Sequence, residues 1–484
     1  MNTIKNRFFS DIARFKNPAG LIVLFLASIG IAFTIKTLGI VGGALIIMAL
    51  IGPPLVFAVI AYPKFGIITI LIAAYFILWV IRLGLIAFPL GTLMDGLLAL
   101  LILGLIIKQK YEPDWTFLKN PISIVIIIWI GYNFIQVINP SAESKLAWLY
   151  TIRTVALVML NYFIFSYHIR SKKFIRLIIK IWLGLSIIGA LYAFKQQYIG
   201  FFGFEEAYLY SDPSIAGLLF IGGQWRKFSI FSDPVAFSYT MVVSSLLCVG
   251  LMFGPFSRVK KWILGFLILL FLSSMLYSGT RGAYVLFPAA MLFLTILIFN
   301  RKILIMTAAG GILLTALIFI PTGNLTLFRF QSAFRPSEDA SFNVRATNQK
   351  MIQPYIQSHP IGGGLGATGV WGAKFSPGSF LASFPPDSGY VRVAVELGWI
   401  GLLIFCTLMF IILKIGIENY YNIRDPELKS YCLAMVLITF AFNIGNYPQE
   451  ALVQYPSNVY FYLVAALINI TYKLDKETLN AQMQ

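Results

Sequence analysis

The stretch Val235–Met252, VAFSYTMVVSSLLCVGLM, runs through eighteen residues without one charged side chain. A helix of about 18 to 20 residues is long enough to cross the hydrocarbon core of a bilayer, which is about 30 Å thick. Similar runs recur along the chain. They are expected to be helices, because lipid leaves every backbone hydrogen bond to be made within the segment. The sequence therefore predicts a protein that spans a membrane many times.

The composition of the whole chain agrees with this prediction. Of the 484 residues, 59% are hydrophobic and 12% are charged, whereas a soluble domain has about a quarter charged residues. A net charge of +18 would suit a nucleic-acid-binding protein, but the basic residues are spread between apolar runs. We therefore expect the lipid bilayer as a partner, and no nucleic acid. The three cysteines lie in or beside apolar runs and predict neither a disulfide nor a zinc cluster.

The apolar runs predict an all-α polytopic protein with about 12 to 14 transmembrane helices. Their expected starts lie near Ala19, Leu38, Phe65, Phe88, Ile122, Trp148, Phe174, Val235, Trp262, Ala283, Ile303, Val391, Tyr431 and Val459. The first run follows a basic segment, as in a signal peptide. No small-residue cleavage site precedes the next run, so we expect the first helix to be retained.

The distribution of Lys and Arg predicts the orientation of these helices. With the amino terminus placed in the cytoplasm, 22 of the 37 Lys and Arg fall on the cytoplasmic side. Most of the others lie in or next to two long outer loops or at the Ser278–Gly282 turn, and the short outer loops are almost free of cations. This asymmetry is the positive-inside pattern, so both termini are expected in the cytoplasm.

The two long outer loops divide the chain into five expected parts. These are N-terminal helices in residues 1–195, a first periplasmic loop in 196–233, central helices in 234–320, a large periplasmic loop in 321–390 and C-terminal helices in 391–484. Loops of this length usually carry function rather than serve only as connectors. We therefore expect the functional site in them.

Two basic motifs lie at the outer membrane surface. Arg226 and Lys227 end the first loop and suit a phosphate or diphosphate, with an interfacial basic and aromatic anchor as the alternative. Arg281, within Ser278–Gly282 (SGTRG), stands between two apolar runs, where an unpaired cation is costly. Its guanidinium can bind a phosphate through two donors, and a structural pair with Asp95 or Glu396 is the alternative.

The second loop adds three further segments, FNVR at 342–345, SHPIGGGLG at 358–366 and PPDSGY at 385–390. The glycines permit close approach of a ligand, although their spacing matches neither a Walker loop nor a dinucleotide-binding loop. His359 is expected to cap a structure rather than to act as a base. Asp387 is a candidate base, with helix capping by Asp387 or Ser388 as the alternative. Burial would raise the Asp387 pKa, and nearby arginines would lower it.

Together these motifs resemble the O-antigen ligase and O-antigen polymerase superfamily of bacterial membrane glycosyltransferases. The resemblance covers roughly Trp225 to Phe405 and rests on four elements. They are Arg226–Phe231 with Asp233-Pro234, the Ser-x-Arg-Gly turn at Ser278–Ala283, Arg345 with the Pro-x-x-Gly-x-Gly segment at His359–Gly364, and Asp387–Tyr390 with Glu396–Gly401. The last element is similar to the one that in the family begins with His-Asn and ends Glu-x-Gly-x-x-Gly.

The resemblance implies a GT-C-like membrane enzyme that acts in lipopolysaccharide or exopolysaccharide biosynthesis at the cell envelope. It would transfer glycan from an undecaprenyl-diphosphate-linked donor to a glycan or lipid acceptor. The reaction would take place on the periplasmic face of the bacterial inner membrane, by an inverting mechanism without metal or cofactor. Arg226, Lys227, Arg281 and Arg345 would bind the diphosphate, with His359 and Glu396 as further candidates, and Asp387 would be the base.

The ligases carry a histidine where this chain has Asp387. This difference favours polymerisation of repeat units over ligation to lipid A core, which is the first alternative. A flippase or other transporter for lipid-linked glycans would also need many spans and cations for a diphosphate. A structural partner of polysaccharide-assembly proteins is the third alternative.

Overall fold

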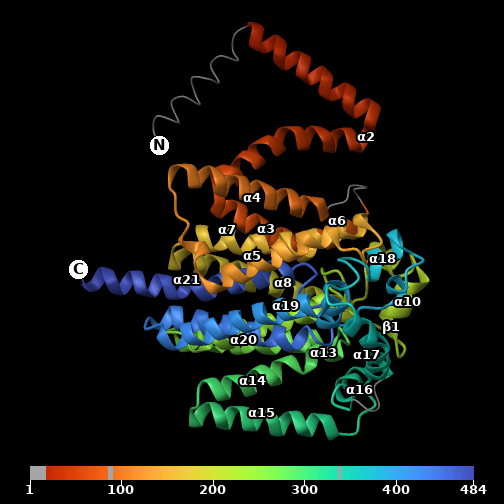
Figure 1. The fold of residues 1–484 in the computed structure, drawn as a ribbon. Coiled ribbons are helices and arrows are strands. Elements are labelled where there is room, and N and C mark those ends of the chain that lie inside the picture. Colours follow the sequence, from red (N-terminus) through yellow and green to blue (C-terminus); the bar gives the residue numbers. More distant parts are fainter. Residues whose placement is uncertain (1–17, 85–90, 336–339, 484) are drawn as a thin grey trace. The chain divides into compact units, whose positions relative to one another are not determined.

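The computed structural model describes residues 18–84, 91–335 and 340–483, and these residues are almost entirely helical (Figure 1). The strands in the described ranges are β1 (Phe220–Ile221) and β2 (Gln224–Trp225), which form one antiparallel pair. The chain divides into two compact units, residues 1–65 and 66–484, which we describe separately. The prediction of an all-α polytopic membrane protein is confirmed.

Ten helices in the described ranges are long and apolar enough to cross a membrane. They are α3 (Pro63–Arg82), α4 (Gly91–Tyr111), α5 (Pro121–Ile135) with η2 (Gln136–Ile138), α6 (Lys145–Val155) with η3 (Leu157–Met159) and α7 (Leu160–His168), α8 (Lys172–Tyr198), α11 (Pro234–Met252), α12 (Arg258–Leu276), α15 (Arg301–Phe319), α19 (Gly389–Asn422) and α20 (Pro426–Gly445).

Shorter apolar helices supply the remaining expected spans. Two lie within α2 (Pro18–Ala61) of the first unit, which is broken at Gly39. A third consists of α13 (Arg281–Tyr284) and α14 (Leu286–Leu297), and α21 (Ser457–Met483) begins where the last span was expected. The expected starts agree with helix starts or breaks to within a few residues. Phe88, where one span was expected to begin, lies outside the described residues.

Helix α11 forms the centre of the second unit. Its amino terminus is fixed by Asp233, whose carboxylate accepts from the backbone N–H groups of Val235 and Ala236 at 2.7 and 3.0 Å. Most of α11 is buried, and it packs against α8, α12 and α20. A helix that is apolar on all sides is expected in such a central position.

The two long loops of the sequence contain short elements at one end of the second unit (Figure 1). The first holds α9 (Gly203–Leu209), α10 (Pro213–Leu219), β1 and β2. The second holds α16 (Leu325–Ser332), α17 (Ala340–Ser358), α18 (Gly369–Phe375) and η5 (Leu381–Ser383). Helices α6, α11, α13 and α19 have their amino termini at this end, which we call the loop end.

Segments assigned to the cytoplasm by their charge meet elsewhere in the second unit. Arg170 contacts Asp114 at 2.9 Å, close to η1 (Thr116–Leu118). Lys172 and Arg176 at the start of α8 contact Asp425 and Glu427 at the start of α20. These helix termini therefore lie together, as the predicted topology requires.

Candidate functional site

Arg226 is hydrogen bonded to the turn that carries Arg281, although the two arginines are far apart in the sequence. Its Nε donates to the carbonyl of Ser278 at 2.9 Å, and its Nη2 donates to the hydroxyl of Thr280 at 3.0 Å. The end of the first loop is thereby fixed against the Ser278–Gly282 turn. Two motifs that the sequence could only place on the same side of the membrane are adjacent in the fold.

A third arginine, Arg329 of α16, packs on the same turn. A Cβ added at Gly279 would lie 2.9 Å from Nη1 of Arg329 and 3.0 Å from its Cζ, so the guanidinium rests against the glycine. Gly279 has a φ of 60°, a conformation that glycine adopts without strain. The Nε of Arg329 is buried and has no hydrogen-bond partner within the described part of the chain. A bound anion would offset the cost of such a donor.

The sequence-based candidates did not include Arg329. Its only signal was its place between Phe328 and Phe330 in a long outer loop, which resembles an interfacial anchor. The requirement for a glycine at Gly279 comes from the packing of Arg329 and could not be derived from the sequence.

The three arginines also act on one another electrostatically. The pKa of Arg226 is lowered to about 10, chiefly by burial and further by the charges of Arg329 and Arg281. Burial likewise lowers the pKa of Arg329, and the charge of Arg281 contributes. Arg226 therefore remains a cation at neutral pH. We call Arg226, Arg281 and Arg329 the arginine cluster, and its concentrated positive charge suits an anion with several oxygens.

Lys227, the other cation predicted in this motif, has an aromatic contact. Its Nζ lies 4.6 Å from the centre of the Phe201 ring, and burial lowers its pKa. A cation held on an aromatic face is stabilised where it stands. Lys227 therefore follows Arg226 in the sequence, and its ammonium group lies over the Phe201 ring.

The charge of Arg345, which lies in α17, acts on Asp387. Burial raises the pKa of Asp387 above its usual value, and the positive charge of Arg345 opposes this effect without cancelling it. The charge of Arg345 also reaches Tyr239 of α11. The Tyr239 hydroxyl would be 3.5 Å from a Cβ added at Gly282, the residue after Arg281. Tyr239 thus lies close to the turn that carries Arg281 and within the electrostatic influence of Arg345.

The amino terminus of α19 is capped by Ser388, whose hydroxyl accepts from the N–H of Val391 at 3.4 Å. The Gly389 N–H donates to the carbonyl of Asn446 at 2.9 Å. Of the two residues considered as caps, Ser388 takes this role. Asp387 is exposed, yet the burial of part of its surroundings raises the pKa of its carboxylate, which suits a general base.

Glu396 is almost fully buried and holds the glycine-rich segment in place. It contacts Arg392 at 3.1 Å, and Arg392 also pairs with Glu450. Its carboxylate accepts from the Gly366 N–H at 2.9 Å and from the Thr368 hydroxyl at 2.6 Å. This network gives Glu396 a positioning task between α19 and the second loop.

The carboxylates considered as partners of Arg281 pair with other arginines. Asp95 contacts Arg153, and Glu396 contacts Arg392. Neither ion pair involves the arginine cluster. Asp95 and Glu396 are therefore each engaged by another arginine.

His359 ends α17. Its ring stacks on Tyr355 with 3.9 Å between ring centres, and its Nδ1 lies 3.0 Å from the Tyr355 carbonyl and 2.9 Å from the Ser358 hydroxyl. These contacts are local to the helix end. The geometry agrees with the expectation of a structural cap.

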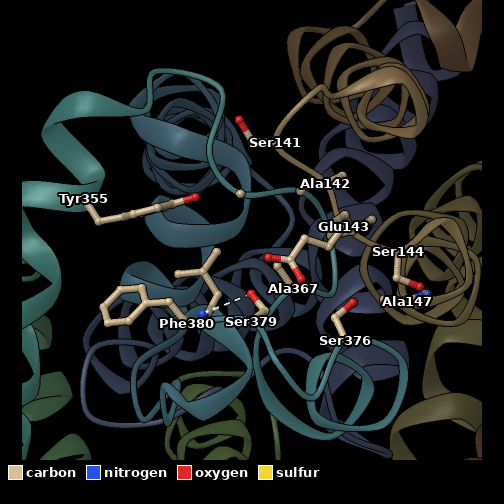
Figure 2. A pocket seen from close by; sticks show the side chains of 14 residues that line it. Ser141, Ala142, Glu143, Ser144, Ala147, Tyr355, Ala367, Ser376, Ser379 and Phe380 are labelled. Atoms are coloured by element: carbon tan, nitrogen blue, oxygen red, sulfur yellow. Dashed lines mark hydrogen bonds between the residues drawn. The ribbon is translucent and has the colours of Figure 1, made fainter.

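A cavity of about 90 Å³ lies at the loop end, and no residue of the arginine cluster lines it (Figure 2). Its walls come from the turn before α6, from Tyr355 of α17 and from residues 363–381. Figure 2 shows the Glu143 carboxylate and the Tyr355 hydroxyl directed toward the space between them. A smaller cavity of about 40 Å³ lies beside Arg392 and Glu396.

Comparison with known proteins gives two matches. Residues 265–406 match the family model described as O-antigen ligase. A protein of Salmonella muenchen described as an O-antigen polymerase is 26% identical over 299 residues, which cover 59% of this chain and 69% of that protein. Over these segments the chain is similar to proteins of the O-antigen ligase and polymerase superfamily.

The segment that matches the family model contains most of the site. It includes Arg281, Arg329, Arg345 and Asp387, whereas Arg226 precedes it. Arg226 is joined to the segment through its hydrogen bonds to Ser278 and Thr280.

Proposed function

We propose that this protein is an O-antigen polymerase that joins repeat units of a surface polysaccharide at the periplasmic face of the bacterial inner membrane. The observation that carries the proposal is the convergence of Arg226, Arg281 and Arg329 on one turn. The donor would be an undecaprenyl-diphosphate-linked glycan, because a diphosphate offers the oxygens that clustered guanidinium groups bind through two donors each.

In the proposed reaction the acceptor hydroxyl attacks the anomeric carbon of the donor sugar. The bond from that carbon to the diphosphate oxygen breaks, and the electron pair leaves with the lipid diphosphate. The arginine cluster stabilises the charge that builds on this leaving group, since fixed cations cost no reorganisation during the reaction. Attack from the face opposite the leaving group inverts the configuration.

The proton of the attacking hydroxyl would pass to the Asp387 carboxylate. Burial raises the Asp387 pKa, which makes the carboxylate a stronger base than a fully solvated aspartate. The positive charge of Arg345 opposes that rise and favours the ionised form. Asp387 and Arg345 are thus expected to work as a pair.

The test is an elongation assay with purified protein in detergent and its lipid-linked repeat unit, with products separated by length. Arg281→Ala and Arg329→Ala should each lower elongation about 100-fold or more, because each removes a fixed donor from the leaving group. Lys350→Ala, which changes an exposed cation of α17, should keep wild-type chain lengths. Normal elongation in both cluster variants would contradict the proposal.

A ligase is the second candidate, because the family model that matches residues 265–406 is described as O-antigen ligase. The same assay separates the two functions. A ladder of products indicates polymerisation, and a single transfer to an added lipid A core acceptor indicates ligation. A transporter would form no product in detergent, because it needs two compartments to act on.

A further inference from the structure

The cavity of Figure 2 is built by the glycine-rich segment of the second loop. A Cβ added at Gly363 would lie 2.1 Å from Cδ1 of Leu381, and a Cβ added at Gly364 would lie 2.5 Å from the Cβ of Ala142. Both glycines therefore let the walls of the cavity come close to each other. Gly364 is also tied to α19 through its N–H, which donates to the carbonyl of Glu396 at 2.9 Å. The cavity is a fixed part of the fold.

The groups that face this cavity are hydroxyls and one carboxylate. Ser141, Ser376 and the phenol of Tyr355 line it, together with Glu143. Within the described ranges, the side-chain oxygens of these four residues make no hydrogen bond or ion pair. The negative charge of Glu143 acts on the Tyr355 phenol, and both groups line the same cavity. A volume of about 90 Å³ can hold several water-sized groups.

Aromatic rings adjoin the polar wall. Tyr150 stacks on Trp371 with 4.6 Å between ring centres, and Phe375 stacks on both rings. Phe375 precedes the lining residue Ser376, and Tyr150 stands one helical turn after the lining residue Ala147. A carboxylate accepts hydrogen bonds from the hydroxyls of a polyol, and hydroxyl side chains can donate to a polyol or accept from it. Nearby aromatic rings can cover the apolar C–H face of the polyol.

Helix α17 runs between the cavity and the expected reaction centre. It has Arg345, whose charge acts on Asp387, near its start and Tyr355 in its last turns. Ten residues of helix span about 15 Å. A glycan chain with its reacting end at Asp387 can therefore extend along α17 to the cavity.

We propose that this cavity is a subsite for a neutral sugar residue of the glycan, some residues away from the bond that forms. The Glu143 carboxylate accepts hydrogen bonds from sugar hydroxyls and repels acidic sugars and the diphosphate. The subsite rests on the proposed function, because it takes the glycan of the same reaction. Through this subsite the enzyme binds the repeat unit independently of the lipid.

The first test is binding of the repeat-unit oligosaccharide, released from the lipid-linked donor by mild acid, to the purified full chain in detergent. Saturation-transfer NMR should detect binding to the wild type. Glu143→Gln and Ser376→Ala should each weaken binding about tenfold, because each changes a polar group of the wall. Glu206→Gln changes an exposed carboxylate of α9 and should bind as the wild type does. Arg281→Ala should also retain binding, since the probe carries no diphosphate.

The second test is elongation by the same variants. Glu143→Gln should raise the KM for the lipid-linked repeat unit about tenfold and shorten the products. Unchanged oligosaccharide binding in Glu143→Gln and Ser376→Ala would overturn the subsite, while normal elongation would leave the transferase function standing. If the wild type binds the oligosaccharide through Glu143 but forms no product, the transferase function fails and the subsite stands.

Discussion

At the scale of single residues, Asp387 is subject to two opposing influences. Burial disfavours its charged form, and the guanidinium of Arg345 favours it. The balance depends on how far the side chain is buried, which composition and spacing do not contain. The sequence indicated both influences, and the structure shows that burial is the larger.

This balance predicts how the pH dependence of elongation responds to Arg345. Replacing Arg345 with glutamine removes the charge that stabilises the carboxylate, so the pKa of Asp387 rises. A base must be ionised to act, and the acidic limb of the rate profile should therefore move to higher pH. Arg345→Lys keeps the charge and should leave the limb close to its wild-type position. The pH at half-maximal elongation measures the effect, and an unmoved limb in Arg345→Gln would show that Asp387 is not the base.

The residues of the arginine cluster show where sequence reasoning ended. Arg226 and Arg281 could be proposed because each stands beside a long apolar run, where a cation needs a reason. Arg329 stands in a loop whose path no periodicity predicts. Its role depends on the packing of α16 over Gly279, a contact between segments about fifty residues apart.

At the scale of elements, the second loop is attached to α19 at a break in that helix. Gly398 has a φ of 71° inside α19, and a Cβ added there would lie 2.0 Å from the Pro360 carbonyl oxygen. Nearby, the Gly363 N–H donates to the carbonyl of Val395 at 2.9 Å. The sequence predicted that the glycines of the second loop permit the close approach of a ligand. In the structure, the group that approaches them is the backbone of α19.

Gly398→Ala should therefore detach the glycine-rich segment from α19. The added methyl group meets backbone and a strained φ, so we expect a loss of about 2 kcal/mol or more of stability. Thermal unfolding in detergent should occur several degrees lower, and proteolysis should become faster within residues 359–366. Gly378→Ala lies in the same loop with open space around its Cβ position and should behave as the wild type. Equal stability of both variants would contradict this account of the break.

At the scale of the whole molecule, hydrophobicity was sufficient to predict the membrane spans but not the structure of the loops. An apolar run of span length has one low-energy form in lipid, so its start can be predicted to within a few residues. The long loops have no such constraint. Helix α17 packs on α19, where Ile352, Leu381 and Phe384 meet Val395, whereas α16 packs on α13 and α15, and α18 packs on α6.

The orientation of the chain is the remaining expectation at this scale. The arginine cluster and the cavity of Figure 2 share the loop end, and Arg258, Lys260 and Lys261 begin α12 beyond a turn assigned to the cytoplasm. If cations are retained in the cytoplasm, the loop end faces the periplasm, where a lipid-linked donor would be polymerised. In a chain with Cys248, Cys406 and Cys432 replaced by alanine, Lys374→Cys should react with an impermeant maleimide in spheroplasts. Lys260→Cys should react only after lysis. The reverse pattern would place the site in the cytoplasm, and the proposed periplasmic reaction would then be wrong even if the arginine cluster binds a diphosphate.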